Sequence, residues 1–357
     1  MHNGYRILTI NPGSTSTKIA VFDDSEMLFE RILRHSDQEL SAIGPVEKQL
    51  DFRLGLTLGA LEQEGIEVAS IDATIGRGGL LRPIPSGVYR VNEAMADELS
   101  TNAHGRHASN LGGLIARRIA DRTGALALVA DPVVVDEMED VARITGIDHI
   151  KRRSVFHALN QKAVARLYAD RAGKKYEQLN LVVAHMGGGV SVGAHRRGRV
   201  VDVNNALDGE GPLSPERAGS VPAGDLVKMC FSGRYTEAEM TRMLTGGGGF
   251  VSLLSTSDMR EVERMAAGGD RKAALVHEAM CYNVGKWIGA MAAALAGEVD
   301  AIILTGGIAH SEQVCGSIGR MVGFLAPVVA MPGENELEAL ALNALRVLRG
   351  ETEPIEY

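Results

Sequence analysis

The stretch that decides the fold is "ILTINPGSTSTKIAVFDD", residues 7–24. Two mostly apolar runs, residues 7–10 and 19–22, flank a turn of small polar residues. Pro12 and Gly13 predict a tight turn, because proline fixes φ and glycine tolerates positive φ. The turn nevertheless carries four hydroxyl residues and a lysine, although two residues would suffice. The pattern predicts a β-hairpin, and it leaves an ordinary exposed turn and an anion-binding turn equally open.

A second stretch, residues 181–203, repeats this plan half a chain later. It reads "LVVAHMGGGVSVGAHRRGRVVDV": an apolar strand, a polar residue, a glycine turn and a second apolar strand. Asn11 and Gly13 align with His185 and Gly187 at an offset of 174 residues. Two such hairpins indicate a duplicated fold with facing halves. A chance match is the alternative, because strand–Gly–strand patterns are common.

Composition limits the class of protein. The 357 residues suit two domains, and an apolar content of 45% supports a large core. The 42 glycines fall in clusters, which suggests loops that bring backbone close to a ligand. A net charge of −8 argues against a nucleic-acid partner, and no apolar run reaches the ~18 residues of a membrane span. Three scattered cysteines and the lack of a signal-peptide pattern predict a cytoplasmic protein with reduced thiols.

Short β-rich runs alternate with helical patterns, which predicts the α/β class. Residues 46–65 predict one helix of about five turns, and helices are expected over residues 222–245 and about 258–296. Ser255 and Asp258 match a capping box, so capping is the favoured role of Asp258 and nucleotide contact the second.

Several polar side chains stand at strand ends or in loops. Lys18 supplies a point charge suited to phosphate, and the backbone N–H groups of a glycine turn can cradle an anion. Arg77 lies between glycines after an apolar strand, and Arg217 lies in a loop; an idle surface position is the alternative for both. Asp131 stands at a strand tip, a common place for a Mg²⁺ ligand, and His157 stands at a helix start.

These segments together resemble the signatures of the acetokinase family. "ILTINPGSTSTK" and "LVVAHMGGGVSVGAHRRG" are similar to its two long signatures, and "LTGGIAHS" is similar to its adenosine segment. "GRGGLLRPIPSGVYRVNE", "HASNLGG", "DPVVVDEM", "RRSVFHALNQKAVAR" and "PGENELEALALNALR" also fit, in order. The resemblance covers the chain essentially end to end.

The resemblance implies the fold shared by acetate and sugar kinases, heat-shock proteins and actin. That fold has two RNase H-like α/β domains around a central cleft, each with a phosphate hairpin. We therefore expect one domain from residues 1–152 plus about 337–357, with the first hairpin and the acyl substrate. The nucleotide-binding domain would comprise residues 153–336. The family also implies a homodimer or a larger homo-oligomer.

The resemblance further implies reversible transfer of the γ-phosphoryl group of ATP to a short-chain carboxylate such as butyrate. A carboxylate with a pKa of about 4–5 is already ionised at neutral pH, so no general base is required. Positive charge, Mg²⁺ and hydrogen-bond donors are needed to bring this anion to a polyanion. A kinase for isobutyrate or propionate is the alternative within the family. A nucleotide-switched binding protein of the actin or chaperone type is the alternative from another class.

The matching motifs place the family's functional residues on this sequence. The expected catalytic residues are Arg77 and Arg217 for the carboxylate and the phosphoryl group, His157 as a donor to the equatorial oxygens, and Asp131 toward Mg²⁺. The expected nucleotide-binding residues are Asn11, Ser14, Ser16 and Lys18 at the first phosphate site, His185, Gly187, Gly188 and Gly189 at the second, and Asp258, Arg260, Gly306 and Gly307 near the nucleoside. The expected substrate residues are His107, Phe156 and Gly79.

Two positions depart from the family's pattern. A gapless match puts Asn335 where the family has its second Mg²⁺-side carboxylate, so Glu334 or Glu336 is expected to serve instead. Gly79 stands where acetate kinases have a bulkier apolar residue, so we expect it to help open room for a longer acyl chain. Each buried CH₂ is worth about 0.8 kcal/mol, so such a pocket would favour butyrate over acetate only modestly.

Overall fold

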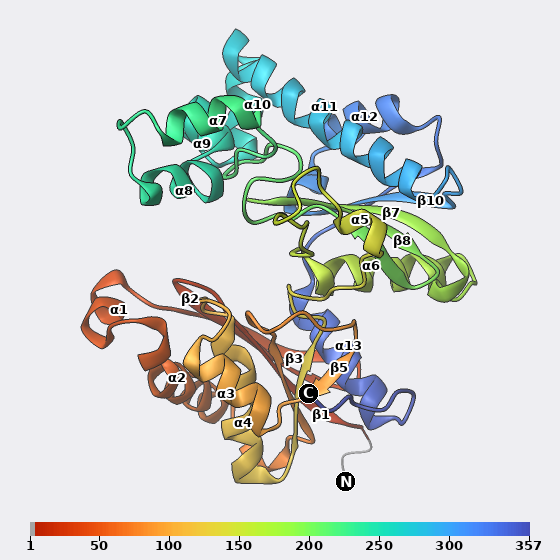
Figure 1. Cartoon of the computed structure of the whole chain (residues 1–357). Helices are drawn as coiled ribbons and strands as arrows, with labels where there is room; N and C mark the ends of the chain where they lie inside the picture. Colours follow the sequence, from red (N-terminus) through yellow and green to blue (C-terminus); the bar gives the residue numbers. More distant parts are fainter. Residues whose placement is uncertain (1–3) are drawn as a thin grey trace. The chain divides into compact units, whose positions relative to one another are not determined.

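The computed structural model describes residues 4–357. The chain divides into two compact units (Figure 1). The first unit consists of residues 4–135 and Asn335–Tyr357, and the second consists of Asp136–Glu334. Each unit has its own sheet and its own hydrophobic core.

A six-stranded sheet forms the centre of the first unit. Its strands are β1 (Arg6–Pro12), β2 (Ser16–Asp23), β3 (Glu26–Arg34), β4 (Ala73–Arg77), β5 (Val88–Arg90) and β6 (Leu126–Ala130), in the order β3-β2-β1-β4-β6-β5. β1 and β2 form the predicted hairpin, with Ile7 opposite Phe22 and Ile10 opposite Ile19. β4 runs parallel to β1 and β6 parallel to β4, so the carboxyl ends of these three strands meet at one edge.

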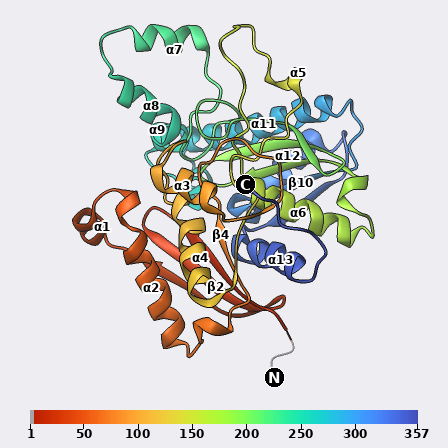
Figure 2. The same ribbon diagram turned by 60° about the horizontal axis from the view of Figure 1, so that its bottom comes forward.

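Helices cover both faces of this sheet (Figure 2). They are α2 (Leu50–Gln63), α3 (Glu93–Thr101), α4 (Asn110–Thr123) and α13 (Glu336–Leu348), whereas the short helix α1 (Asp37–Ile43) buries none of its residues. Short 3-10 turns are η1 (Val46–Lys48) and η2 (Val68–Ser70). Leu8 and Ile10 share one core with α2 and α4, because alternate side chains of a strand face the same side. α13, from the end of the chain, packs against β1 and β4 on the opposite face.

A five-stranded sheet forms the centre of the second unit. Its strands are β7 (Asn180–Met186), β8 (Val190–Arg196), β9 (Arg199–Val203), β10 (Ala301–Gly306) and β11 (Val328–Pro332), in the order β11-β10-β7-β8-β9. β7, β10 and β11 are parallel, so His185 and Gly306 stand at the same carboxyl edge. β7 and β8 form the second predicted hairpin.

Helices also cover both faces of the second sheet. α6 (Ala158–Arg171) covers one face, and α10 (Met259–Ala267), α11 (Arg271–Ala294) and α12 (Glu312–Val322) cover the other. The unit also contains α5 (Asp140–Arg143), α7 (Ala223–Cys230), α8 (Glu237–Thr245) and α9 (Gly249–Leu254), with 3-10 turns η3 (Tyr176–Gln178) and η4 (Gly307–His310). Leu181 and Val183 face α6, whereas Val182 and Ala184 join the core formed with α10, α11 and α12.

The two sheets share one topology. In the first unit an antiparallel hairpin carries a third antiparallel strand on one side and two parallel strands on the other, in the order β3-β2-β1-β4-β6. The second unit repeats the same arrangement as β9-β8-β7-β10-β11. The repeated sequence plan therefore reflects a duplicated fold.

One predicted helix is shorter than expected, and two predicted helical regions each hold two helices. The segment at residues 46–65 begins with η1 and continues as α2, so it is shorter than one five-turn helix. The segment at 222–245 is split into α7 and α8, and the segment at 258–296 into α10 and α11. Gly233 and Gly269 lie in these two breaks with φ of 71° and 94°, which an α-helix cannot accommodate.

Residues 136–152 belong to the second unit, which differs from the expected boundary at residue 152. Lys162, which is 1% exposed, pairs with Glu137 at 2.7 Å. Arg152 pairs with Asp202 at 2.8 Å. Removing one member of a buried ion pair leaves an uncompensated charge, so these pairs hold the segment on the second sheet.

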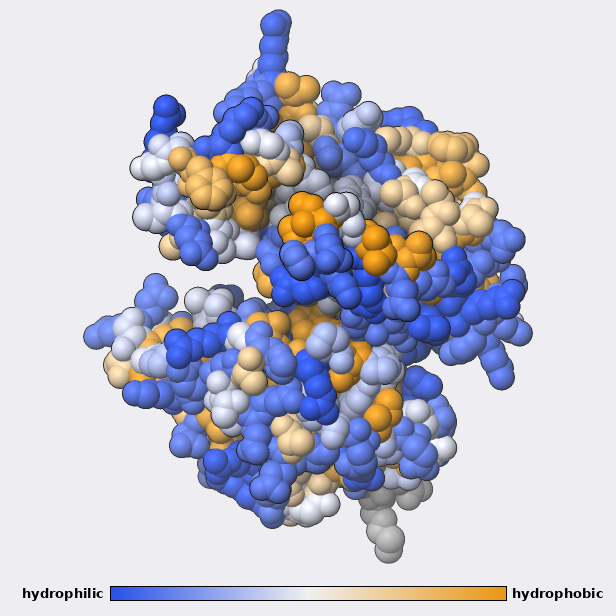
Figure 3. All heavy atoms as spheres, in the orientation of Figure 1, coloured by the Kyte–Doolittle hydropathy of each residue, from blue (hydrophilic) through white to orange (hydrophobic). Residues whose placement is uncertain are grey.

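The surface of the second unit carries exposed apolar side chains (Figure 3). α7 buries none of its residues, and the neighbouring Phe231 is 87% exposed. Within residues 4–357, no helix is both long enough and apolar enough to cross a membrane.

Candidate active site

The turn of the first hairpin lies at the carboxyl edge of the first sheet. Asn11 pairs with Lys18 across the hairpin, and residues 13–15 form the turn. Asn11 is buried, whereas Ser14 and Lys18 are exposed and Ser16 is half-buried. The four residues expected at the first phosphate site therefore stand on one short turn, which presents a hydroxyl group and an ammonium group.

A buried arginine supports this turn from α2. Arg53 is fully buried, and its Nη1 donates to the backbone oxygens of Gly13 and Ser16 at 2.8 and 3.0 Å. Its Nη2 donates to the backbone oxygen of Ser14 at 3.0 Å. These bonds direct the carbonyl oxygens toward α2. The N–H of a trans peptide points away from its C=O, so the following N–H groups are directed away from Arg53.

The positive charge of Arg53 has no carboxylate partner within residues 4–357. Its remaining hydrogen bonds go to Thr17 Oγ1 at 3.1 Å and to Gln49 Oε1, which accepts from Nη2 at 2.9 Å and from Nε at 3.2 Å. Burial lowers the pKa of Arg53 from its usual value, but a guanidinium in a protein stays protonated. The fold therefore keeps a cation directly beneath a turn that is expected to bind phosphate.

Asn11, Arg77 and Glu336 form a second group at this edge. Arg77 ends β4, and its Nη1 lies 3.3 Å from Glu336 Oε2 and 3.5 Å from Asn11 Oδ1. The amide nitrogen of Asn11 donates to the same oxygen of Glu336. Of the two candidate glutamates, Glu336 thus joins the first hairpin, whereas Glu334 belongs to the second unit. Asn335 precedes α13, and its side chain does not cap that helix.

Asp131 follows β6 in a left-handed conformation, with φ of 38°. It is 2% exposed, and its Oδ1 accepts hydrogen bonds from Ser86 Oγ at 2.6 Å and Gly87 N at 3.0 Å. Among residues 4–357, no three carboxylate, histidine or cysteine groups gather closely enough to hold a metal ion. Mg²⁺ usually binds through one or two carboxylates, waters and phosphates of the substrate. Asp131 and Glu336 therefore fit an ion that arrives with its nucleotide, and not a site made by protein alone.

Gly79 packs against the start of α4. A Cβ atom on Gly79 would lie 2.5 Å from Asn110 Cα and 2.8 Å from Asn110 N, which is closer than real contacts allow. The missing side chain therefore leaves no room for an acyl chain, which contradicts the expected role of Gly79. His107, nearby in the chain, is exposed, and its Nδ1 lies 2.7 Å from Ser109 Oγ.

The glycine turn of the second hairpin, residues 187–189, is packed by the loop that carries Arg217. The backbone oxygen of Gly188 accepts hydrogen bonds from Ser214 Oγ at 2.7 Å and Glu216 N at 3.1 Å. The guanidinium of Arg217 lies so close to Gly189 that a Cβ atom there would overlap it. Burial lowers the pKa of Arg217, and within residues 4–357 its Nε has no hydrogen-bond partner. Gly189 thus makes room for an arginine.

Close backbone packing fixes the loop of Arg217. Phe250 N donates to Ser214 O at 3.2 Å, and Ser214 N donates to Arg217 O at 3.0 Å. Gly249 has a φ of 56°, and a Cβ atom there would overlap Ser214 O and lie 2.8 Å from Arg217 O. Gly249, the first residue of α9, therefore lets the loop of Arg217 pack closer than any residue with a side chain would allow.

Two histidines stack at the carboxyl edge of the second sheet. The rings of His157 and His185 are 3.8 Å apart and inclined by 13°. His185 Nδ1 lies 2.7 Å from Asn160 Oδ1, and its Nε2 lies 3.7 Å from Glu334 Oε1. His157 Nδ1 lies 2.9 Å from Ser191 Oγ. One expected catalytic residue and one expected nucleotide-binding residue are thus in direct contact.

The residues expected near the nucleoside lie in two places in the second unit. Asp258 is the N-cap of α10, as predicted, and its side chain accepts a hydrogen bond from Arg260 N. Ser255 instead ends α9 with φ of 61°, so the two residues do not form the predicted capping box. Arg260 pairs with Asp258 at 2.8 Å, and this hydrogen bond is the main reason that the pKa of Asp258 falls to about 2. Gly306 and Gly307 join β10 to η4, and a Cβ atom on Gly306 would overlap the backbone of Met186.

The structure thus brings Asn11, Arg77 and Glu336 into contact in the first unit and His157 and His185 into contact in the second. Asp131 bonds to Ser86 and Asp258 pairs with Arg260, outside these two groups. Phe156 is 2% exposed and precedes His157, and its substrate role stays a prediction. Sequence reasoning missed Arg53, Gln161 and Ser191, which support the predicted residues from beneath. Arg53 shares the buried face of α2 with Thr57 and Leu61. A charged residue at a position that the helical period assigns to the buried face is the sequence feature that points to it.

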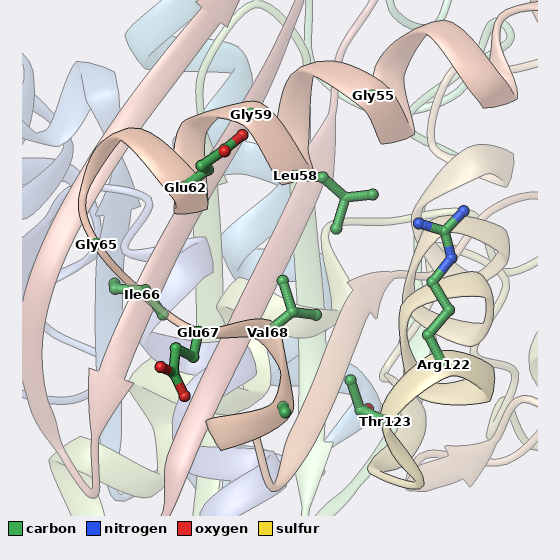
Figure 4. Close-up of a pocket in the computed structure, with 11 residues that line it drawn as sticks. Gly55, Leu58, Gly59, Glu62, Gly65, Ile66, Glu67, Val68, Arg122 and Thr123 are labelled. Atoms are coloured by element: carbon green, nitrogen blue, oxygen red, sulfur yellow. The ribbon is translucent and has the colours of Figure 1, made fainter.

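A surface pocket in the first unit lies apart from these residues (Figure 4). Leu58, Val68 and Arg122 are among its lining residues. The lining residues Gly65–Ala69 come shortly before the start of β4, and the lining residue Thr123 comes shortly before the start of β6. Arg77 and Asp131 stand at the carboxyl ends of the same strands, so the pocket lies at the opposite edge of the sheet.

Known proteins resemble this chain over nearly its whole length. Butyrate kinase 1 of Clostridium acetobutylicum is 55% identical over 353 residues, which cover 99% of both chains. Butyrate kinase 2 of the same organism is 52% identical over 353 residues, with the same coverage.

Solved structures resemble the fold at low sequence identity. An acetate kinase from Porphyromonas gingivalis superposes with a TM-score of 0.80 at 17% identity, over 96% of this chain and 100% of that one. A propionate kinase from Francisella tularensis superposes with a TM-score of 0.74 at 18% identity, over 95% of this chain and 98% of that one. The predicted fold, an α/β protein of the acetate kinase and actin type, is therefore confirmed.

The sequence profile of one family matches residues 139–325, which are more than half of the chain. Together with the relatives above 50% identity, this match shows that the chain belongs to the acetokinase family.

Proposed function

We propose that this chain transfers the γ-phosphoryl group of ATP reversibly to butyrate, giving butyryl phosphate and ADP. The observation that carries the proposal is the identity of 55% and 52% to two butyrate kinases over 99% of the chain. Relatives of the family that differ in substrate superpose at below 20% identity and support the fold alone.

In this reaction a carboxylate oxygen attacks the γ-phosphorus, and the bond to the β–γ bridging oxygen breaks. The electron pair leaves with ADP, and no proton must be removed from the nucleophile. The main difficulty is repulsion between two anions, which fixed positive charge and donors relieve. Arg77 and Arg217 would offset the charge of the carboxylate and the transferring group, and His157 would donate a hydrogen bond to the equatorial oxygens.

The two hairpins would hold the phosphates. In the first unit the N–H groups of the turn, Ser14 and Lys18 would contact phosphate oxygens, with Arg53 beneath them. In the second unit His185 and residues 187–189 would form the other phosphate site. Asp258, Arg260, Gly306 and Gly307 would bind the nucleoside.

Mg²⁺ is part of the proposal, supported by two carboxylates of the first unit, Glu336 beside the first hairpin and Asp131 just after β6. Asp131 and Glu336 would hold it together with the nucleotide, and Glu334 is the alternative to Glu336. When bound, the ion supplies positive charge that stabilises the transferring phosphoryl group. Arg77 and Asn11 would orient Glu336, because both already contact its carboxylate.

We also propose a homo-oligomer in the cytoplasm. The exposed apolar side chains around α7 support self-association, because a short helix that buries nothing gains little stability alone. The three cysteines, which form no disulfide, suit a reducing compartment. Sedimentation measurements over a range of concentrations would test the association.

An acyl-hydroxamate assay with ATP and Mg²⁺ tests the activity. The substrates should run from acetate to hexanoate and include isobutyrate, with each acid measured for kcat/KM. We expect the highest value for butyrate, with neighbouring chain lengths lower by less than about tenfold, because one buried CH₂ is worth about 0.8 kcal/mol. A higher kcat/KM for isobutyrate or propionate would show that butyrate is not the preferred substrate. If none of the acids gave an acyl phosphate, the proposed kinase activity would be refuted.

A further inference from the structure

A chain of hydrogen bonds runs from His157 into the interior of the second unit. His157 Nδ1 contacts Ser191 Oγ at 2.9 Å, and Gln161 Nε2 donates to the same oxygen at 2.8 Å. Gln161 Oε1 lies 2.9 Å from His195 Nε2, and His195 Nδ1 lies 2.6 Å from the hydroxyl of Tyr176. Ser191, Gln161 and His195 are 0% exposed, so water does not compete for these bonds.

The sequence builds this chain from two periodicities. His157 and Gln161 are four residues apart, one turn of α6, so they share a helix face. Ser191, Gly193 and His195 alternate along β8, so they share the sheet face toward α6. A Cβ atom on Gly193 would lie 2.6 Å from Gln161 Oε1 and 3.2 Å from His195 Nε2. The glycine therefore leaves room for the bond between the amide and the imidazole.

The orientation of the Gln161 side-chain amide determines which ring nitrogen of His195 carries the proton. Its Nε2 also donates to the backbone oxygen of Ser191 at 3.1 Å, and a carbonyl oxygen can only accept. The amide oxygen must therefore face His195 and accept its Nε2–H. Burial, with smaller effects of Lys162 and Arg166, lowers the pKa of His195 well below its usual value, so the ring is neutral. Its Nδ1 then accepts the hydrogen bond from the Tyr176 hydroxyl.

The hydroxyl of Ser191 in turn determines which ring nitrogen of His157 accepts a hydrogen bond. Ser191 Oγ already accepts from Gln161, and it has one proton to donate. Of the groups that the structure records around Ser191 Oγ within residues 4–357, His157 Nδ1 is the one that can accept this proton. A neutral His157 whose Nδ1 accepts must carry its proton on Nε2.

We infer that Ser191, Gln161, His195 and Tyr176 are positioning residues that hold His157 as the Nε2–H tautomer, so that it presents a neutral N–H donor. This inference rests on the proposed function, in which His157 donates to the phosphoryl group. It assigns to the buried residues a task that packing alone would not require.

His185, stacked on His157, provides an internal comparison. Asn160 Nδ2 donates to Gly333 O at 3.3 Å, so Asn160 Oδ1 faces His185 and accepts from its Nδ1–H. The two stacked rings therefore carry opposite arrangements at Nδ1: acceptor in His157 and donor in His185.

Nitrogen-15 NMR of the full chain labelled at histidine tests the inference directly, because two-bond correlations distinguish the tautomers. His157→Gln and His185→Gln variants assign the two signals. Near neutral pH we expect the Nε2–H pattern for His157 and a protonated Nδ1 for His185. Finding His157 as the Nδ1–H tautomer would overturn the inference.

Variants then test the chain of hydrogen bonds from Tyr176 through His195, Gln161 and Ser191 to His157, called the relay below. Gln161→Leu and Ser191→Ala should each give His157 a mixture of tautomers, while His185 keeps its pattern. They should lower kcat by about tenfold to a hundredfold with KM for ATP changed less than about twofold. Thr57→Ala, which removes a buried hydroxyl in the first unit, is the matched control and should change neither tautomer.

The NMR result separates this inference from the proposed function. If wild-type protein forms acyl phosphate but Gln161→Leu leaves the His157 tautomer unchanged, the relay is refuted and the kinase remains. If no acid is phosphorylated but the tautomers are as expected, the relay stands as a structural device and its catalytic purpose is refuted.

Discussion

Replacing Arg53 with methionine tests how the first hairpin is held. Methionine has a similar length and an apolar stem, but it has no donor. The change removes the hydrogen bonds to the backbone oxygens of Gly13, Ser14 and Ser16 and to the hydroxyl of Thr17. The turn keeps its sequence and loses only its support from α2.

The magnitude follows from these bonds. A buried acceptor left without a donor costs about 1–3 kcal/mol, and water can reach part of this turn, so the lower end applies to each. Gly13 O, Ser14 O and Gln49 Oε1 lose their donors. Ser16 O still accepts from Gly13 N, and Thr17 Oγ1 still pairs with His35. The lost bonds together amount to about 4 kcal/mol, and the relief of an unpaired buried cation offsets part of them. We expect the free energy of unfolding of the first unit to fall by about 3 kcal/mol. For a unit of this size, that corresponds to a melting temperature lower by roughly 6–12 °C.

Urea unfolding and steady-state kinetics together provide the assay. Arg53→Lys keeps the charge but not the planar fork, so it should recover part of the stability and little of the geometry. ATP should raise the melting temperature of Arg53→Met less than that of wild type, because the turn no longer directs its N–H groups outward. Arg122→Met, at an exposed position on α4, is the matched control. If Arg53→Met equals Arg122→Met in stability and in KM for ATP, the reasoning is refuted.

Three further predictions concern single residues. Lys18→Ala should lower kcat/KM for ATP by more than tenfold and leave the free energy of unfolding within about 0.5 kcal/mol, because Lys18 is exposed; normal turnover would make it dispensable. Arg77→Ala and Arg217→Ala should each lower kcat far more than nucleotide affinity, measured by calorimetry, and an effect on KM alone would contradict their transition-state role. The lowered pKa of His195 means that the unfolded chain binds a proton that the folded one does not. The contribution of His195 to the free energy of unfolding should therefore be constant above about pH 6.5. Below that pH the free energy of unfolding should decrease by up to ~1.4 kcal/mol per pH unit. His195→Asn should flatten this pH dependence, measured by urea unfolding.

The sequence predicts the parts of this fold that depend on local pattern. Alternating apolar residues and small-residue turns predict both hairpins, and the offset between Asn11 and His185 predicts that they belong to one repeated plan. The two five-strand arrangements confirm this plan. The breaks within long helical patterns were less visible, because Gly233 and Gly269 interrupt helices only where the backbone turns left-handed.

Long-range contacts account for what the sequence does not reveal. Gly79 looks like a space-making glycine until Asn110, thirty-one residues later, occupies the position of its side chain. Arg53 looks like one more helical charge until its distance to the turn at Gly13 is known. The choice between Glu334 and Glu336 also depends on the packing of α13 against β1, which no local pattern encodes.

The contact between Gly189 and Arg217 constrains how this enzyme can evolve. Alanine is the smallest change available to a glycine, and at position 189 it already overlaps the guanidinium. Substitution at 189 is therefore conditional on the residue at 217. Losing Arg217 first removes the charge proposed for catalysis, and changing Gly189 first displaces the arginine, so either order passes through an impaired intermediate. The pair should behave as strongly epistatic, with Gly189→Ala harmful beside Arg217 and nearly neutral beside a smaller residue.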